Sequence, residues 1–181
     1  FGAFDTRRTT APVERKRLWA GRKGAFGAMG RIAPDLYVAD VVAPRTRLRE
    51  IVTAATVACR ERDLKLANVF HAGDGNLHPN ISYDRRDADE VRRVLEAGRI
   101  IMEACVEAGG SLTGEHGIGL EKQDEMCLVF SDDDLAAMDQ LRGAFDPDAF
   151  WNPGKMLPVR GCREIHTRPL PTHAQPAEDA S

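Results

Sequence analysis

The sequence has no apolar run that approaches the roughly 20 residues needed to cross a bilayer as a helix. It also has no excess of basic charge, since 25 Lys and Arg residues stand against 28 Asp and Glu residues, for a formal net charge of −3. Basic residues alternate with acidic ones, as in RDADEVRRVLE, which is typical of solvated helix faces. We therefore expect neither a membrane span nor a nucleic-acid partner.

Cysteine is scarce, with four residues in the chain and no CxxC motif among them. Cys59 and Cys105 fall within apolar stretches of predicted helices, so we expect them to be buried free thiols and not members of disulfides. Free thiols are typical of reducing compartments, and the sequence therefore favours a cytoplasmic location.

The 181 residues are 43% hydrophobic and 29% charged, which is enough apolar material for one core of domain size. The chain begins with FGAFDTRR and has no initiator methionine. This opening resembles the end of an earlier structural element, so we interpret the chain as a fragment or as a protein whose N-terminal part is missing.

Hydrophobic periodicity predicts four helices and three strands. The expected order is a helix over 13–29, a strand over 36–44, a helix after Thr46, strands over 65–71 and 77–84, a helix over 87–108, and a last helix that begins at SDDDL and stops before Pro147. This order predicts an α+β fold: an incomplete ferredoxin-like domain with an antiparallel sheet and helices on one face, followed by a C-terminal helical segment. A fourth strand would have to precede the first residue. Four glycines in the first helix indicate close approach of another backbone: Gly21, Gly24, Gly27 and Gly30.

The segment HAGDGNLHPN joins the second and third predicted strands and carries two histidines. A tight hairpin would bring His71 and His78 to the same end of the sheet, where two imidazoles and a carboxylate could hold a divalent ion. Glu115, in the loop GGSLTGEHGIG, is the natural third ligand, and His116 beside it is a candidate base. The alternative is that both histidines only bond to nearby backbone; spacing alone leaves both interpretations open. Asp74 fits turn chemistry better than metal binding.

Other templates do not match. GDGNLH lacks the third glycine of a dinucleotide-binding loop, GEHGIG lacks the second histidine of HExxH, and SDDDLAAMD lacks the glycine and terminal glutamate of an EF-hand. Arg22 is either an exposed helix residue or a clamp for a carboxylate. On local grounds, Asn152 in WNPGKMLP could belong only to a turn.

Four segments together resemble the C-terminal half of FAD-linked oxidases of the vanillyl-alcohol-oxidase type, which include glycolate oxidase and D-lactate dehydrogenase. They are LWAGRKGAFGAMGRIAPDLYVADVVAPR, NVFHAGDGNLHPNISYD, GGSLTGEHGIGLEKQDEM and FDPDAFWNPGKMLP. The resemblance implies that His71, His78 and Glu115 bind a divalent metal such as Zn or Mn. It also implies that His116 is the general base that removes the substrate's hydroxyl proton.

The same resemblance implies that Arg22 and Asn80 bind a small 2-hydroxy acid and that Asn152 lies near the flavin ring. It implies oxidation of glycolate or D-lactate to the 2-oxo acid, with hydride transfer to FAD. Further partners would be an N-terminal flavin domain and an iron–sulfur subunit, and the enzyme could associate with the inner face of the membrane. Phe26 and Val38 stand where relatives that use a longer diacid carry Thr and Lys, which favours a substrate with one carboxylate.

The resemblance also divides the chain. We expect an N-terminal loop over 1–13, a substrate-binding cap domain over 14–145, a segment over 146–160 that returns to the flavin domain, and a disordered tail over 161–181. Because the flavin domain's glycine-rich loop is not in this sequence, we expect FAD to be bound mainly outside it and the chain alone to be inactive. The alternative is a standalone metal-binding or assembly module without redox activity.

Overall fold

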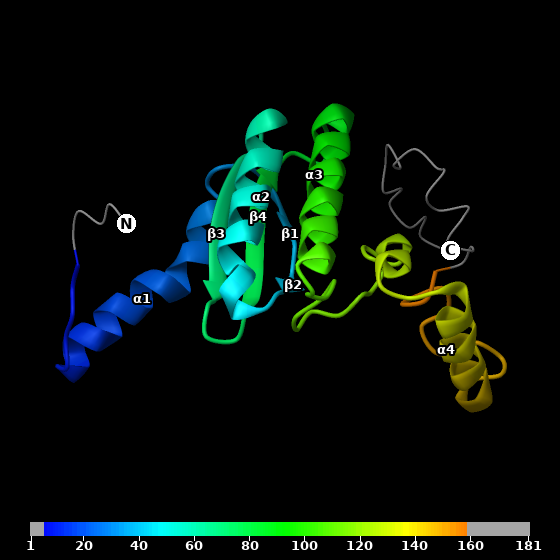
Figure 1. Ribbon diagram of the computed structural model, residues 1–181. Coiled ribbons are helices and arrows are strands. Elements are labelled where there is room, and N and C mark those ends of the chain that lie inside the picture. The colour runs from blue at the N-terminus through cyan, green and yellow to red at the C-terminus, as the bar shows by residue number, and fades with distance from the viewer. Residues whose placement is uncertain (1–5, 159–181) are drawn as a thin grey trace.

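A computed structural model describes residues 6–158 of the chain (Figure 1). Its helices and strands, in order, are α1 (Pro12–Met29), β1 (Asp35–Val38), β2 (Val41–Val42), η1 (Arg45–Arg47), α2 (Leu48–Glu61), β3 (Lys65–His71), β4 (Asn76–Tyr83), α3 (Ala88–Glu107), η2 (Asp124–Leu128) and α4 (Asp132–Phe145). None of these helices is long and apolar enough to cross a membrane. The predicted tail over 161–181 lies outside the described residues.

Strand β4 is the centre of the sheet. It pairs antiparallel with β3 along one edge and with both β1 and β2 along the other. The single strand expected over 36–44 is therefore wrong in detail, because it is interrupted at residues 39 and 40. The register nevertheless continues across the interruption: Val38 pairs with Asn80, and Val41 pairs with Leu77. No residue is inserted, so position 40 lies opposite position 78.

The hairpin between β3 and β4 forms as the sequence predicts. His71 pairs with Asn76, and residues 72–75 make the turn. Gly75 adopts a φ of +80°, and a Cβ atom there would lie 2.2 Å from the carbonyl oxygen of Ala43. Glycine at position 75 thus allows both the left-handed backbone conformation and the close approach of the turn to the segment around Ala43.

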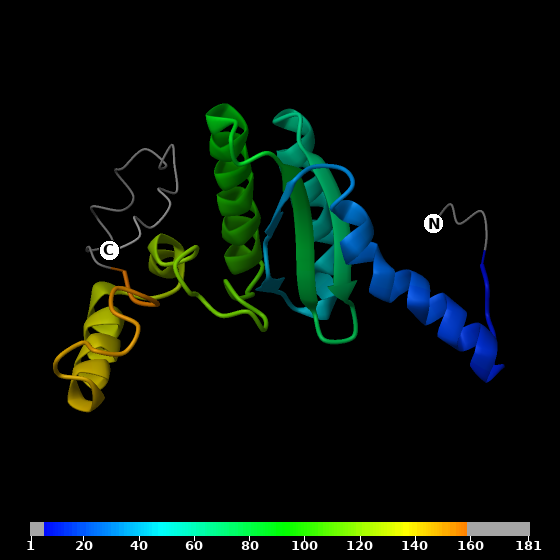
Figure 2. The same ribbon diagram turned by 180° about the vertical axis from the view of Figure 1, so that it is seen from behind.

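Helices α2 and α3 cover one face of the sheet, and Figure 2 shows the opposite face, which they leave open. The core between these layers is apolar and includes Ile51, Ala55, Cys59, Leu77, Ile81, Val94, Ile101 and Cys105. Both core cysteines are free and buried, as expected. The α+β fold with an antiparallel sheet and helices on one face is confirmed.

Helix α1 extends away from the sheet (Figure 1). An added Cβ atom at Gly21, Gly24 or Gly27 would meet no atom within 4 Å. The close backbone approach expected from these glycines is therefore not made by any part of the chain that the structure describes.

The C-terminal segment is a helical lobe beside α3, and Leu135 of α4 belongs to the same apolar core cluster (Figure 1). Ser131 and Asp134 form a capping box at the start of α4. Arg142, near the end of α4, donates hydrogen bonds to the carbonyl oxygens of Trp151, Asn152 and Lys155. This single guanidinium fixes the irregular chain that follows the helix.

Candidate active site

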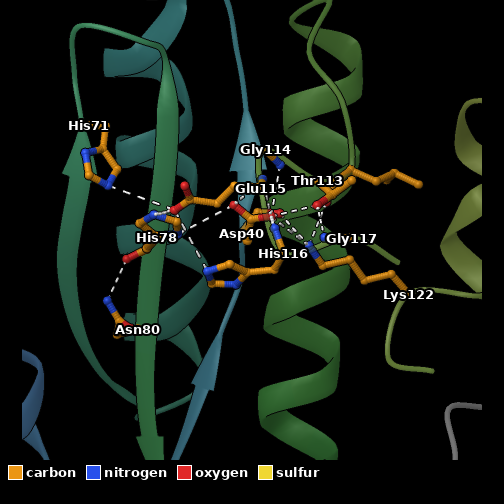
Figure 3. Close-up of polar contacts among 11 residues, drawn as sticks. Asp40, His71, His78, Asn80, Thr113, Gly114, Glu115, His116, Gly117 and Lys122 are labelled. Carbon is orange, nitrogen blue, oxygen red and sulfur yellow. Dashed lines mark hydrogen bonds and ion pairs between the residues drawn. The ribbon is translucent and has the colours of Figure 1, made fainter. Parts of the chain in front are cut away.

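The hairpin places two histidines on the open face of the sheet. His71 ends β3, and His78 lies within β4 opposite Val69. Side chains alternate between the faces of a strand, so His78 points away from the core while its neighbour Leu77 packs into it. The two rings meet edge to face with centroids 5.6 Å apart (Figure 3). The sequence prediction that the hairpin joins these imidazoles is confirmed.

The loop after α3 brings Glu115 and His116 to the same place (Figure 3). Oε1 of Glu115 lies 2.9 Å from Nε2 of His78, 3.9 Å from Nε2 of His71 and 4.0 Å from Nε2 of His116. The ring of His116 stacks on that of His78, with centroids 5.1 Å apart. Three imidazole nitrogens thus surround one carboxylate oxygen.

Asp40 holds this loop in place through hydrogen bonds. Its side chain is fully buried, and its Oδ2 accepts hydrogen bonds from four donors: Thr113 Oγ1 (2.7 Å), Gly114 N (2.9 Å), Glu115 N (3.0 Å) and His116 N (2.9 Å). Burial by itself raises the pKa of Asp40, but these hydrogen bonds outweigh it and hold the pKa at about 2. Asp40 is therefore an ionised acceptor that fixes the backbone on which Glu115 and His116 stand.

Lys122 is the buried cation of the site. Its ammonium group donates hydrogen bonds to the carbonyl oxygens of Asp40 and Leu112 and lies 3.9 Å from Oδ2 of Asp40. Burial lowers the pKa of Lys122, while the charge of Asp40 opposes that change. The pair neutralises charge within the protein and joins the strand segment to the loop.

His78 lies between two carboxylates, with Nδ1 3.6 Å from Oδ1 of Asp40 and Nε2 close to Glu115. Burial lowers the pKa of His78, although both carboxylates act in the opposite direction. A lowered pKa favours the neutral imidazole near neutral pH, which is the form that binds metals. His78 is only 8% exposed, whereas the side chains of His71, Glu115 and His116 are about half exposed.

Asn80 lies on the same face of β4, one alternation beyond His78, and is fully buried. Its amide nitrogen donates to the carbonyl oxygens of His78 (2.7 Å) and Ala67 (3.3 Å). Its Oδ1 atom has no hydrogen-bond partner within the described part of the chain. A buried, oriented acceptor of this kind can accept a hydrogen bond from a hydroxyl group of a bound molecule.

The remaining predicted site residues lie further out. Asn152, with a left-handed φ of 46°, lines a cleft of about 530 Å³, and His116 lines an adjoining cleft of about 440 Å³. The two clefts share the loop at 117–119 and Lys155. Arg22 is exposed on α1, and no polar contact within residues 6–158 joins it to the histidine cluster. The structure thus brings together His71, His78, Glu115 and His116, but not Arg22.

The cluster has the donor set of a transition-metal site. Imidazole nitrogen together with carboxylate oxygen suits Zn and other first-row divalent ions. Ligand atoms of Asp40, His78, Glu115 and His116 all lie within 4.8 Å of one another. Because Asp40 already accepts from four donors, it fits the role of a support better than that of a ligand. The side chains of His78, Glu115 and His116 therefore fit a divalent ion, and His71, which is outside this compact group, has its Nε2 3.9 Å from Oε1 of Glu115.

Two residues of the site were not predicted, Asp40 and Lys122. The signal for Asp40 was an acid inside the otherwise apolar run LYVADVVAP, where a charge is costly unless something satisfies it. Lys122 had no comparable signal, since LEKQDEM reads as an ordinary charged surface segment.

The sheet supplies two imidazoles, and the loop after α3 adds a third imidazole and a carboxylate, a set of side chains that suits ion binding and proton transfer. Comparison with known proteins identifies the family to which this chain belongs. The profile described as "FAD linked oxidases, C-terminal domain" matches residues 1–156, and the chain belongs to that family.

Curated relatives agree with this assignment. The chain is 45% identical over 176 residues to glycolate oxidase subunit GlcD of Escherichia coli K12, covering 94% of this chain and 35% of that protein. It is 37% identical over 140 residues to GlcD of Bacillus subtilis, covering 77% and 30%. It is 29% identical over 153 residues to the mitochondrial D-lactate dehydrogenase [cytochrome] of Arabidopsis thaliana, covering 83% and 27%. The chain thus spans about a third of the length of these relatives.

Proposed function

We propose that this chain is the substrate-binding part of a flavin-dependent 2-hydroxy-acid dehydrogenase that oxidises glycolate or D-lactate to the 2-oxo acid. The observation that carries the proposal is the convergence of three imidazole nitrogens on Oε1 of Glu115, within 2.9 to 4.0 Å. Family membership and the names of the relatives, which are glycolate oxidase subunits and D-lactate dehydrogenases, support the same reaction class.

His71, His78 and Glu115 would hold a divalent metal such as Zn or Mn. A bound divalent ion acidifies an alcohol that it coordinates, so that a neighbouring base can deprotonate it near neutral pH. His116 is that base in our proposal, because its Nε2 lies 4.0 Å from the Glu115 oxygen and its ring is held against His78. The proton of the substrate hydroxyl would pass to Nε2 of His116.

Asn80 and Arg22 would orient the substrate. The free Oδ1 of Asn80 is a fixed acceptor on the same face as the metal ligands. Arg22 would bind the carboxylate, which requires α1 to approach the sheet more closely than in the structure described here. FAD, bound mainly outside the residues of this chain, would supply the acceptor for the hydride that leaves the substrate's Cα atom. Asn152 would lie beside the flavin ring.

The division of the chain follows from these roles. Residues 14–145 would form the cap over the substrate, and residues 146–160 would return toward the flavin-binding part. The relatives named GlcD are subunits, so further subunits, among them an iron–sulfur protein, are part of the proposal.

The test is a panel of 2-hydroxy acids on the full-length protein, scored by dye reduction, with metal content measured alongside. We expect glycolate or D-lactate to be the best substrate, and Glu115→Gln to lose both the metal and more than about 99% of turnover. Glu61→Gln, which makes the same change on the exposed end of α2, should retain both. Normal turnover of Glu115→Gln with the metal retained would contradict the site, and no oxidation of any 2-hydroxy acid would contradict the function.

A further inference from the structure

We propose that Asp40 is a positioning residue that sets the tautomer of His78. By attracting the ring proton to Nδ1, it leaves the lone pair of Nε2 free to bind the metal beside Glu115. This inference rests on the proposed function, because it concerns the same ion.

The geometry starts from the register of the sheet. Val38 pairs with Asn80 and Val41 with Leu77, so Asp40 stands directly opposite His78 across the interruption between β1 and β2. Cross-strand neighbours share a face of the sheet. The carboxylate of Asp40 therefore lies beside the imidazole of His78, with Oδ1 3.6 Å from Nδ1 (Figure 3).

The two nitrogens of His78 meet different carboxylates. Nδ1 is buried and has no hydrogen-bond partner within residues 6–158, and the carboxylate of Asp40 is the anion beside it. Nε2 lies 2.9 Å from Oε1 of Glu115. A neutral imidazole carries one proton, so one nitrogen donates and the other offers a lone pair. The carboxylate that accepts the hydrogen bond from the ring N–H therefore decides which nitrogen is left as a metal ligand.

Asp40 is the better placed of the two carboxylates to accept the hydrogen bond from the ring N–H of His78. It is fully buried and fixed by four donors on Oδ2, whereas the side chain of Glu115 is 51% exposed. A charge acts more strongly on a neighbour in the protein interior than in water. The other oxygen of Asp40, Oδ1, receives only a long contact of 3.3 Å from the Glu115 amide and so remains able to accept from Nδ1.

An Asp40→Asn substitution separates the two tasks of this residue. The amide oxygen can take the place of Oδ2 and keep the hydrogen bonds to the loop, which places the NH2 group opposite His78. An NH2 group donates, so Nδ1 must then accept and the ring proton moves to Nε2. A protonated Nε2 has no lone pair for a metal.

Thr113→Val is the matched control. It removes one of the four donors to Oδ2 and the hydrogen bond from Gly117 N to the hydroxyl, but leaves Oδ1 and His78 untouched. If Asp40 acted only by holding the loop, the two variants would weaken metal binding to a similar degree.

The experiment uses the full chain labelled with ¹⁵N-histidine, with tautomers read from long-range ¹H–¹⁵N spectra near neutral pH and Zn²⁺ affinity measured by chelator competition. We expect Nδ1–H for His78 in the unaltered metal-free chain and Nε2–H in Asp40→Asn. We expect Zn²⁺ affinity to fall about 10- to 100-fold in Asp40→Asn and only a few-fold in Thr113→Val.

Nε2–H in the unaltered metal-free chain would overturn the inference, and so would equal Zn²⁺ affinity in the unaltered chain and Asp40→Asn. If Asp40→Asn does not fold, as judged by circular dichroism, the tautomer of the unaltered chain decides alone. Failure of the unaltered chain to bind Zn²⁺ would count against the proposed function, whereas the tautomer is measured without metal.

Discussion

Lys122 and Asp40 make a buried ion pair. Lys122 also donates hydrogen bonds to backbone carbonyl oxygens, and Asp40 accepts hydrogen bonds from backbone amides. Replacing Lys122 by Met leaves the carbonyl oxygens of Asp40 and Leu112 without their donor and removes the cation nearest the Asp40 carboxylate. Breaking a buried pair from one side costs several kcal/mol, because the remaining charge stays desolvated. We expect Lys122→Met to lower the free energy of unfolding by about 3 kcal/mol in urea titrations. Lys65→Met, an exposed lysine in β3, should change it by less than about 0.5 kcal/mol.

Gly114 shows how closely the site loop is packed. A Cβ atom there would lie 2.3 Å from Oδ1 of Asn76, a buried side chain at the start of β4. Gly114→Ala should therefore push the loop away from the hairpin, lowering stability by about 1 to 3 kcal/mol and weakening Zn²⁺ binding. Gly73→Ala, in the hairpin turn, has open space around it and is the control. Thermal unfolding and Zn²⁺ titration of both variants check this, and equal behaviour would contradict it.

Cys59 and Cys105 should be chemically inert in the folded chain. Both are buried, and burial raises the pKa of each thiol to about 11. Thiolate is the reactive form, so neither residue should be alkylated by iodoacetamide near neutral pH until the chain is unfolded. Peptide mapping by mass spectrometry before and after guanidinium treatment measures this, and rapid labelling in the native chain would show that the α2 and α3 layer opens.

At the scale of elements, the contact between α3 and β1 depends on one glycine. A Cβ atom at Gly98 would lie 2.6 Å from the hydroxyl oxygen of Tyr37 and under 3 Å from its ring. Gly98→Ala should separate the helix from the sheet and lower the free energy of unfolding by about 1 to 3 kcal/mol, despite the better helix propensity of alanine.

Gly143 in α4 provides the opposite case. It has no neighbour within 4 Å of an added Cβ atom, so Gly143→Ala should raise helix stability by up to about 1 kcal/mol. Unfolding midpoints of the two variants should move in opposite directions. A shift of the same sign would mean that propensity, and not packing against Tyr37, controls both helices.

Elements with a strong local pattern could be predicted from the sequence. The hairpin of β3 and β4 combines alternating strands with a turn rich in glycine, and α3 is capped by Asp87, whose side chain accepts hydrogen bonds from the amides of Asp89 and Glu90. The bounds of the two strands and of α3 were predicted to within one or two residues. The meeting of the two hairpin histidines was predicted as well.

Features that depend on distant contacts could not be predicted. The interruption of the first strand and the burial of Asp40 depend on donors 73 to 76 positions later in the chain. The helix expected directly after Thr46 is preceded by η1, so α2 starts only at Leu48 and has no side-chain cap. The apolar run LYVADVVAP makes Asp40 an unusual acid, but nothing local to it identifies the donors that satisfy the carboxylate.

At the scale of the whole molecule, large apolar side chains remain exposed at both ends of the described chain. Trp19 in α1 is 56% exposed and Trp151 after α4 is 63% exposed, and they are the two tryptophans of the sequence. Phe145 and Phe150 beside Trp151 are even more exposed. Apolar surface of this extent marks an interface, and the chain spans about a third of its relatives' length.

We therefore expect the fluorescence of this chain to resemble that of tryptophan in water and to be quenched readily by acrylamide. In a full-length protein of the relatives' size the emission should shift to shorter wavelength, with weaker quenching, if the additional domain covers these side chains. Trp19→Phe and Trp151→Phe assign the change to one end or the other. Identical spectra for the chain and the full-length protein would show that these surfaces stay in water.

The unbroken register across the interruption between β1 and β2 has a consequence for how this segment can vary. Because side chains alternate between faces, inserting or deleting one residue between Asp35 and Asp40 would exchange the faces of everything beyond it. The acid would enter the core, and an apolar side chain would stand opposite His78. Apart from Asp40, a substitution here changes the contacts of one side chain, whereas a change of length would remove the support of the site at once. The segment should therefore tolerate variation in composition far better than variation in length.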